Sequence, residues 1–192
     1  MSEYQYYEFQ AVDRLLDEKE MQVLRRYSTR AEIEPDRFFN EYQRGDFKGN
    51  PGLWMEKYFD GYLYFANWGT HELHLRVPAK SLSLKTAQEN CPGHDLESGA
   101  AVREKDGKLI FVFVSQDEYG DDGEEEYGPL ALFLPLREDL CRGDMRALYV
   151  AWLLTVQGGA VSEDEVEPPV PPNPGTPSPA LRKLIQFLRI DD

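Results

Sequence analysis

Alternating apolar and polar positions predict a hairpin in the middle of the chain. Over 71–77 apolar and polar side chains alternate, as in a half-buried strand, and an aromatic-rich run precedes them over 62–68. Folding the chain at Gly69-Thr70 pairs Ala66 with Leu73 and brings the apolar residues of the second strand onto one face. A two-residue turn with glycine first suits type II′ geometry, so we predict a hairpin over 62–77.

A second hairpin is predicted over 101–114, where Asp106-Gly107 separates two strand-like runs. This dipeptide is a strong signal for a two-residue hairpin turn. The second strand, 108–114, is continuously apolar. Such a strand buries both of its faces, so we expect it near the centre of the sheet.

Helical spacing of apolar residues predicts three helices in the body of the chain. Asp17 is the expected N-cap of the first, with Glu20 as its partner in a capping box. Pro51 fits the first turn of the second helix, and Asp144 is the expected cap of the third, which ends at Gly158-Gly159. The predicted helices cover 18–28, 51–59 and the stretch between 144 and 158, the last with a buried face of Met145, Leu148, Tyr149, Trp152 and Val156.

The remaining segments complete an α+β prediction: a mostly antiparallel sheet built from the hairpins 62–77 and 101–114, with about three helices packed on it. Residues 79–99 show no period and are expected to form a long connection. Further strands are expected at 6–12, 31–34, 39–44 and 130–136.

Residues 1–160 are therefore expected to form a single α+β domain. Residues 161–180 are first acidic and then proline-rich, which is the composition of an extended linker. Over 181–192, apolar residues recur at i, i+3, i+4 and i+7 from Leu181, which predicts the start of a truncated amphipathic helix. A helix this short is unstable alone, so it either packs back on the domain or belongs to a structure that the chain end truncates.

Composition and charge narrow the classes of partner. The chain is 41% hydrophobic and 12% aromatic, as in a globular protein, and its formal net charge is −14. An acidic chain is not expected to bind nucleic acid directly or to dock on anionic lipid, whereas a protein partner is possible. With two cysteines, no signal peptide at the start and no apolar run long enough to span a bilayer, we expect a cytoplasmic protein; the oligomeric state is left open.

The sequence contains little catalytic chemistry. Cys91 and His94 have the spacing of half a zinc site, but the other available ligands are Cys141, His71 and His74, and the two last are expected on opposite faces of one strand. There is no nucleophile elbow and no phosphate-binding glycine motif. The acidic segment 117–126 lacks EF-hand spacing and is expected to be a solvated loop. We therefore expect neither a metal nor a cofactor, and no catalytic residue is assigned.

One glycine-rich loop, 45–52, is the best candidate for a binding site. It places Asp46 and Lys48 on either side of Phe47, and Trp54 follows directly. An acid, a base and two rings on one connection form a plausible ligand-binding surface. The alternative is that the glycines shape a turn while Phe47 and Trp54 anchor it to the core.

Several segments resemble a family of uncharacterised bacterial cytoplasmic proteins that has no assigned function. They are Tyr7-Glu-Phe-Gln-Ala-Val-Asp-Arg14, Ser28-Thr-Arg-Ala-Glu-Ile33, Gly45-Asp-Phe-Lys-Gly49, Asn67-Trp-Gly-Thr70 and Gly143-Asp-Met-Arg-Ala-Leu-Tyr149. The resemblance spans most of the chain and implies a bacterial cytoplasmic protein. Members of the family look longer than this chain, which suggests truncation, and no activity, cofactor or site residue comes with the resemblance.

Three functional hypotheses follow. The first is a non-enzymatic interaction or regulatory module, favoured by the missing catalytic motifs, the aromatic content and the acidic surface. The second is a hydrolase-type enzyme whose site is assembled from scattered residues, among them Asp46, Lys48 and the histidines. The third, weaker hypothesis is an acidic mimic of nucleic acid, which needs carboxylates arrayed along one face.

Overall fold

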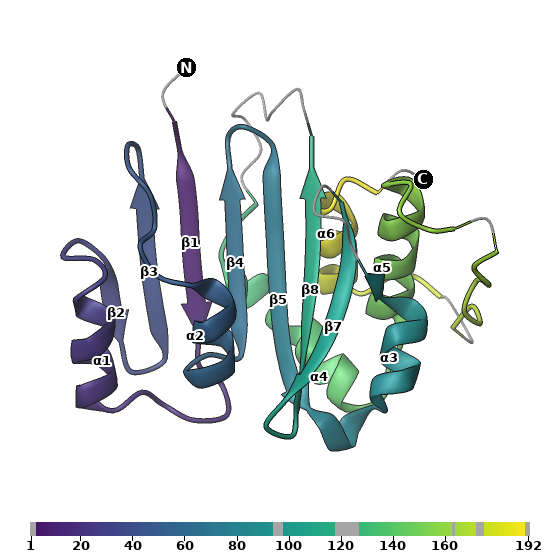
Figure 1. Ribbon diagram of the computed structural model, residues 1–192, viewed down its shortest axis with the longest axis horizontal. Coiled ribbons are helices and arrows are strands. Elements are labelled where there is room, and N and C mark those ends of the chain that lie inside the picture. The colour runs from purple at the N-terminus through teal and green to yellow at the C-terminus, as the bar shows by residue number, and fades with distance from the viewer. Residues whose placement is uncertain (1–2, 94–97, 118–126, 163, 172–174, 191–192) are drawn as a thin grey trace.

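The computed structural model describes residues 3–93, 98–117, 127–162, 164–171 and 175–190, and its centre is one antiparallel sheet (Figure 1). The strands are β1 (Gln5–Gln10), β2 (Glu32–Glu34), β3 (Arg37–Tyr42), β4 (Gly61–Ala66), β5 (Thr70–Pro78), β6 (Pro92–Gly93), β7 (Gly99–Lys105) and β8 (Lys108–Gln116). Their order across the eight-stranded sheet is β2-β3-β1-β4-β5-β8-β7-β6.

Helices pack on both faces of this sheet. They are α1 (Glu18–Arg25), α2 (Pro51–Lys57), α3 (Leu84–Asn90), α4 (Leu134–Cys141), α5 (Arg146–Gln157) and α6 (Pro179–Phe187), with short 3₁₀ turns η1 (Ala79–Ser81) and η2 (Leu130–Leu132). The predicted α+β class with an antiparallel sheet is confirmed. The prediction of about three helices is wrong, because the described residues form six α-helices.

Two hydrophobic clusters lie on opposite faces of the sheet. Side chains of α3, α4, α5 and α6 belong to the first cluster, and side chains of α1 and α2 belong to the second. Strand β8 contributes to both, because Leu109 and Phe111 point into the first cluster and Ile110 into the second. The predicted central position of this strand, between β5 and β7, is confirmed.

The β4–β5 hairpin exists, but its predicted register is wrong. Leu63 lies opposite Leu73, and Ala66 lies opposite Thr70. The loop contains three residues rather than two, and Gly69 closes it with φ +93° and a hydrogen bond of 2.9 Å from its N–H to the Ala66 carbonyl. A glycine in the left-handed region at the third position is typical of a three-residue hairpin loop. The register therefore moves by an odd number of residues, which exchanges the faces of one strand relative to the other.

The β7–β8 hairpin matches its prediction. Lys105 lies opposite Lys108, so Asp106-Gly107 is a two-residue turn. Both turn residues have positive φ, +51° and +72°, as a type I′ turn requires.

Two further segments, one between the hairpins and one after them, were assigned wrongly. The expected connection 79–99 contains α3, a helix capped by the Ser83 hydroxyl that buries little besides Ala87, so its apolar pattern is too sparse to show a period. The expected strand 130–136 is η2 followed by the start of α4. A short apolar run does not distinguish strand from helix, and Pro135 fits the first turn of a helix better than the interior of a sheet.

The predicted ends of the other helices are close to the observed ones. Asp17 and Glu20 form the predicted capping box of α1, and Pro51 stands in the first turn of α2. In α5 the cap position is Met145, although the Asp144 carboxylate does accept a hydrogen bond of 3.0 Å from the Arg146 N–H. The predicted buried face of α5 is only partly right: Leu148 and Trp152 are buried, Val156 is exposed, and Ala147, Val150, Ala151 and Leu154 are buried instead.

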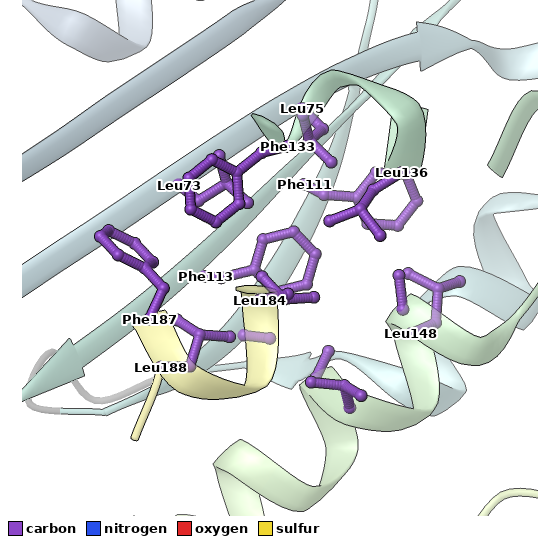
Figure 2. Close-up of a cluster of buried hydrophobic side chains, with 14 of the residues drawn as sticks. Leu73, Leu75, Phe111, Phe113, Phe133, Leu136, Leu148, Leu184, Phe187 and Leu188 are labelled. Atoms are coloured by element: carbon purple, nitrogen blue, oxygen red, sulfur yellow. The ribbon is translucent and has the colours of Figure 1, made fainter. Parts of the chain in front are cut away.

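Helix α6 packs back on the sheet. Figure 2 shows Leu184, Phe187 and Leu188 among side chains of β5, β8, α4 and α5. All three are fully buried, and the Phe187 ring lies 5.2 Å from the Phe133 ring. The described residues between α5 and α6 form no helix or strand. Within the described part of the chain, no helix is both long and apolar enough to cross a membrane.

Candidate functional site

The loop between β3 and α2 is anchored by its two aromatic residues. Trp54 is only 4% exposed, and its ring lies 4.9 Å from the rings of both Phe38 and Phe47. Gly49 permits this packing, because a Cβ at that position would overlap the Phe47 ring. Phe47 and Trp54 therefore lie in the second cluster and its border, beneath the surface that the rest of the loop presents.

Asp46 and Lys48, the two charged members of the predicted site, line a groove at the β2–β3 end of the sheet. The groove has a volume of about 850 Å³. One wall is the turn that follows α1, and the other is the end of β3 with the loop after it. Its lining residues are 26–30, 40–46 and 48, and we call this set the arginine groove.

The name reflects the distribution of arginine partners. The three arginines of the groove, Arg26, Arg30 and Arg44, donate no side-chain hydrogen bond and form no ion pair within the described part of the chain. Each of the remaining arginines donates at least one side-chain hydrogen bond. They are Arg14, Arg25, Arg37, Arg76, Arg103, Arg137, Arg142, Arg146, Arg182 and Arg189. Unpaired guanidinium groups thus gather in one place.

The charge of the groove is opposite to that of the whole chain. The three arginines and Lys48 face two carboxylates, Glu41 and Asp46. Glu41 already accepts a hydrogen bond of 2.8 Å from the Tyr4 hydroxyl. Burial, together with this bond, raises the pKa of the Tyr4 phenol. The groove therefore has a cationic excess on a chain of formal charge −14, which suits an anionic ligand.

A set of local hydrogen bonds holds the turn 26–30 in place. The Ser28 hydroxyl accepts from the N–H of Ala31 at 3.1 Å and from the Asn40 amide at 3.1 Å. Arg25 donates to the Ala31 carbonyl at 2.6 Å. Serine and arginine thus tie the turn to itself and to β3, which fixes the width of the groove.

Two tyrosines add aromatic surface to the groove. Tyr27 is 39% exposed, and its ring meets Trp54 edge to face at 5.3 Å. Tyr42 meets Tyr7 in the same manner at 5.5 Å. Because both rings are held by buried neighbours, they offer contact area with little further loss of conformational entropy.

The two histidines on β5 lie on opposite faces of the sheet, as predicted. His71 is fully buried; it stacks on the Phe187 ring at 4.7 Å, donates from Nδ1 to the Phe187 carbonyl at 2.5 Å and accepts from Arg189 at Nε2. His74 Nε2 lies 2.5 Å from a Glu72 carboxylate oxygen, and its Nδ1 is buried without a hydrogen bond. Neither ring reaches the arginine groove, so the histidines and the groove form no common site.

The remaining candidates for chemistry do not gather. Cys91 is buried, and burial raises the pKa of its thiol, while His94 lies outside the described residues. Of the acidic segment 117–126 only Asp117 is described. Over the described ranges, no group of three or more His, Cys, Asp or Glu side chains is placed to hold a metal ion.

Sequence reasoning identified two of the charged residues of the groove and missed its arginines. The signal was present: Arg25-Arg-Tyr-Ser-Thr-Arg30 is a dense basic run in an acidic chain. Comparison with family models, with curated proteins and with solved structures found no match. Function is therefore inferred from the chemistry of the groove.

Proposed function

We propose that this protein is a non-enzymatic interaction module that binds an acidic segment of a partner protein in the arginine groove. The observation that carries the proposal is the gathering of Arg26, Arg30 and Arg44, which have no partner in the described chain. A guanidinium group presents a fixed fork of donors that matches a carboxylate, and arginine is enriched in protein interfaces. The anchored Tyr27 and Tyr42 supply the aromatic contacts that such interfaces also favour.

The charge of the surrounding chain favours a short acidic segment over a long polyanion. Charges separated by more than about 8 Å are largely screened at physiological salt. A segment confined to the groove meets its cationic excess, whereas a nucleic acid that extends past the groove meets a protein surface of formal charge −14. This supports a protein ligand and agrees with the expectation of no direct binding to nucleic acid.

Magnitudes show that the arginines cannot supply all of the affinity. An exposed ion pair contributes about 0.2–1 kcal/mol, so three of them together change the dissociation constant by roughly a factor of ten. Aromatic and main-chain contacts have to add to this. The arginines then confer selectivity for acidic ligands, and affinity falls as ionic strength rises.

The test is a titration of the intact chain with a short fluorescein-labelled peptide of alternating glutamate and valine, followed by fluorescence anisotropy. We expect the triple variant Arg26→Ala, Arg30→Ala, Arg44→Ala to bind this peptide about tenfold or more weakly than the unsubstituted protein. A peptide of alternating serine and valine is expected to bind neither protein.

A matched control removes the same charge elsewhere. Lys19, Lys80 and Lys85 are exposed and make no ion pair or side-chain hydrogen bond among the described residues. The triple variant Lys19→Ala, Lys80→Ala, Lys85→Ala is expected to bind within a factor of two of the unsubstituted protein. An equal loss in both triple variants, or no binding of the acidic peptide to the unsubstituted protein, would overturn the proposal.

A further inference from the structure

The main-chain edge of β3 is open along the arginine groove. Strand β2 pairs with β3 only from Glu34↔Arg37 to Glu32↔Phe39. Strand β3 continues to Tyr42, and over this second half it pairs with β1 alone. Where a longer β2 would have continued, the turn 26–30 forms no strand, and it contacts β3 through the Ser28 hydroxyl, which accepts a hydrogen bond from the Asn40 side-chain amide.

The outward main-chain groups can be identified from the register. The Ala11 N–H donates to the Asp36 carbonyl at 2.8 Å, in line with the β1–β3 pairing of Phe9 with Phe38. Even-numbered residues of β3 therefore turn their N–H and C=O groups toward β1, and odd-numbered residues turn theirs away. Glu41 thus presents its main-chain groups to the groove, and the described residues provide no hydrogen bond to them.

The side chains beside this edge differ between the two faces of the sheet. Even-numbered Phe38 and Tyr42 lie with the second cluster, the face that also carries Tyr27 through its contact with Trp54. Glu41 points to the other face, where its carboxylate meets Tyr4. If a strand were added at this edge, every second side chain would therefore lie on the face of the turn that carries Arg26 and Arg30. The side chains between them would lie on the face of the Glu41 carboxylate.

We infer that the partner segment binds as an extended strand that continues the sheet at Glu41, with acidic side chains at alternate positions. This rests on the proposed function and specifies its ligand. Peptides that add a strand to a sheet edge gain affinity from main-chain hydrogen bonds and specificity from alternate side chains. Strand addition supplies the main-chain contacts that the arginines alone lack, and the charge pattern of the groove selects acids at every second residue.

The test is a scan of the glutamate–valine peptide in which one main-chain nitrogen at a time is methylated. In an added strand only alternate N–H groups point at β3. We expect methylation at positions of one parity to weaken binding to the intact protein about tenfold or more, and methylation at the other parity to leave it within a factor of two. A peptide with two adjacent glutamates in place of the alternating pattern is expected to bind more weakly.

A complementary variant acts on the protein. Glu41→Pro removes one outward N–H, which an edge strand tolerates, whereas Glu41→Ala keeps the N–H and removes the same carboxylate. The proline variant is expected to bind about tenfold or more weakly than the alanine variant, which separates the loss of the N–H from the loss of the carboxylate. If the proline variant is unfolded by circular dichroism, the methylation scan alone decides.

The outcomes separate the two proposals. Loss of binding in the arginine triple variant, with no parity in the methylation scan, would overturn strand addition and leave the acidic-ligand proposal standing. Failure of every acidic peptide to bind would overturn both. Concentration-dependent dimerisation in sedimentation velocity that the peptide competes away would identify a second copy of this chain as the occupant and overturn the assignment of a partner protein.

Discussion

The two edges of the sheet are treated differently by the rest of the chain. At the far edge, β6 pairs with β7, and α3 and α5 pack against it. There the buried Thr155 hydroxyl accepts a hydrogen bond of 3.2 Å from the Ala100 N–H. At the near edge the outward amide of Glu41 has no partner among the described residues, and a groove lies beside it. The chain covers the far edge and leaves the second half of β3 without a neighbouring strand, which is the arrangement expected of a binding edge.

An open edge carries a risk of indiscriminate pairing, and its surroundings reduce that risk. Natural sheets protect exposed edges with short strands and charged side chains. Here the open part of β3 is short, and three unpaired arginines lie around it. Neighbouring copies of this chain also repel each other, since each has a formal charge of −14. The same groups that favour an acidic segment disfavour a neutral or basic one.

The largest expected loss of stability comes from removing a buried ring beneath the open edge. Trp54→Ala deletes a buried ring that contacts Phe9, Phe38 and Phe47, and we expect it to lower the free energy of unfolding by about 3–5 kcal/mol. Urea denaturation followed by circular dichroism measures this. Acidic-peptide binding is expected to fall as well, because the wall of the groove loses its anchor.

The control for this variant is Trp68→Ala, at a tryptophan that is 42% exposed. Its effect on the free energy of unfolding is expected to be about 1 kcal/mol or less. If the two tryptophan variants lost equal stability, the second cluster would not be the support of the groove.

The next largest loss of stability is expected from removing a hydrogen bond at the covered edge. Thr155→Val removes the hydroxyl that accepts from Ala100 and leaves that N–H buried and unpaired, which we expect to cost about 1–3 kcal/mol of unfolding free energy. Hydrogen exchange at the Ala100 amide is expected to accelerate. Thr155→Ser keeps the hydroxyl and serves as the matched control. Equal exchange rates at Ala100 in the two variants would show that β6 and the helices, rather than Thr155, protect this edge.

Features set by a few neighbouring residues were predictable from sequence. The capping box of Asp17 and Glu20 is local, and Asp106-Gly107 specifies its turn because both positions require positive φ. The β4–β5 register was not predictable in the same way, because Gly69 is compatible with a two-residue or a three-residue loop and only the packing of both faces decides.

The groove itself could be predicted only in part. Asp46 and Lys48 stand on the loop that was singled out, and beside them Trp54 is buried and Phe47 is partly buried at the border of the second cluster. Arg26 and Arg44 line the same groove because the β2–β3 hairpin, which lies between them in the sequence, folds the chain back. Whether an arginine lacks a partner depends on every residue around it in space, and a single sequence does not contain that information.

The smallest expected effect concerns α1, which leads into the turn 26–30. A hydrogen bond from Arg14, with a smaller one from the Asp17 main chain, holds the pKa of Glu20 below its ordinary value of 4.5. A carboxyl group with a lowered pKa stabilises the fold above its unfolded pKa, and this contribution is lost as the pH falls through the folded value.

Glu20→Gln keeps an acceptor for the capping box but loses the ion pair, so we expect a loss of about 0.2–1 kcal/mol of unfolding free energy at pH 7. This difference from the unsubstituted protein should shrink toward zero below pH 4.5 in urea denaturation, and should be absent at every pH when Arg14→Gln is also present. A difference that persisted in acid would mean that Glu20 does not support α1, and with it the wall of the open edge, through its ion pair with Arg14.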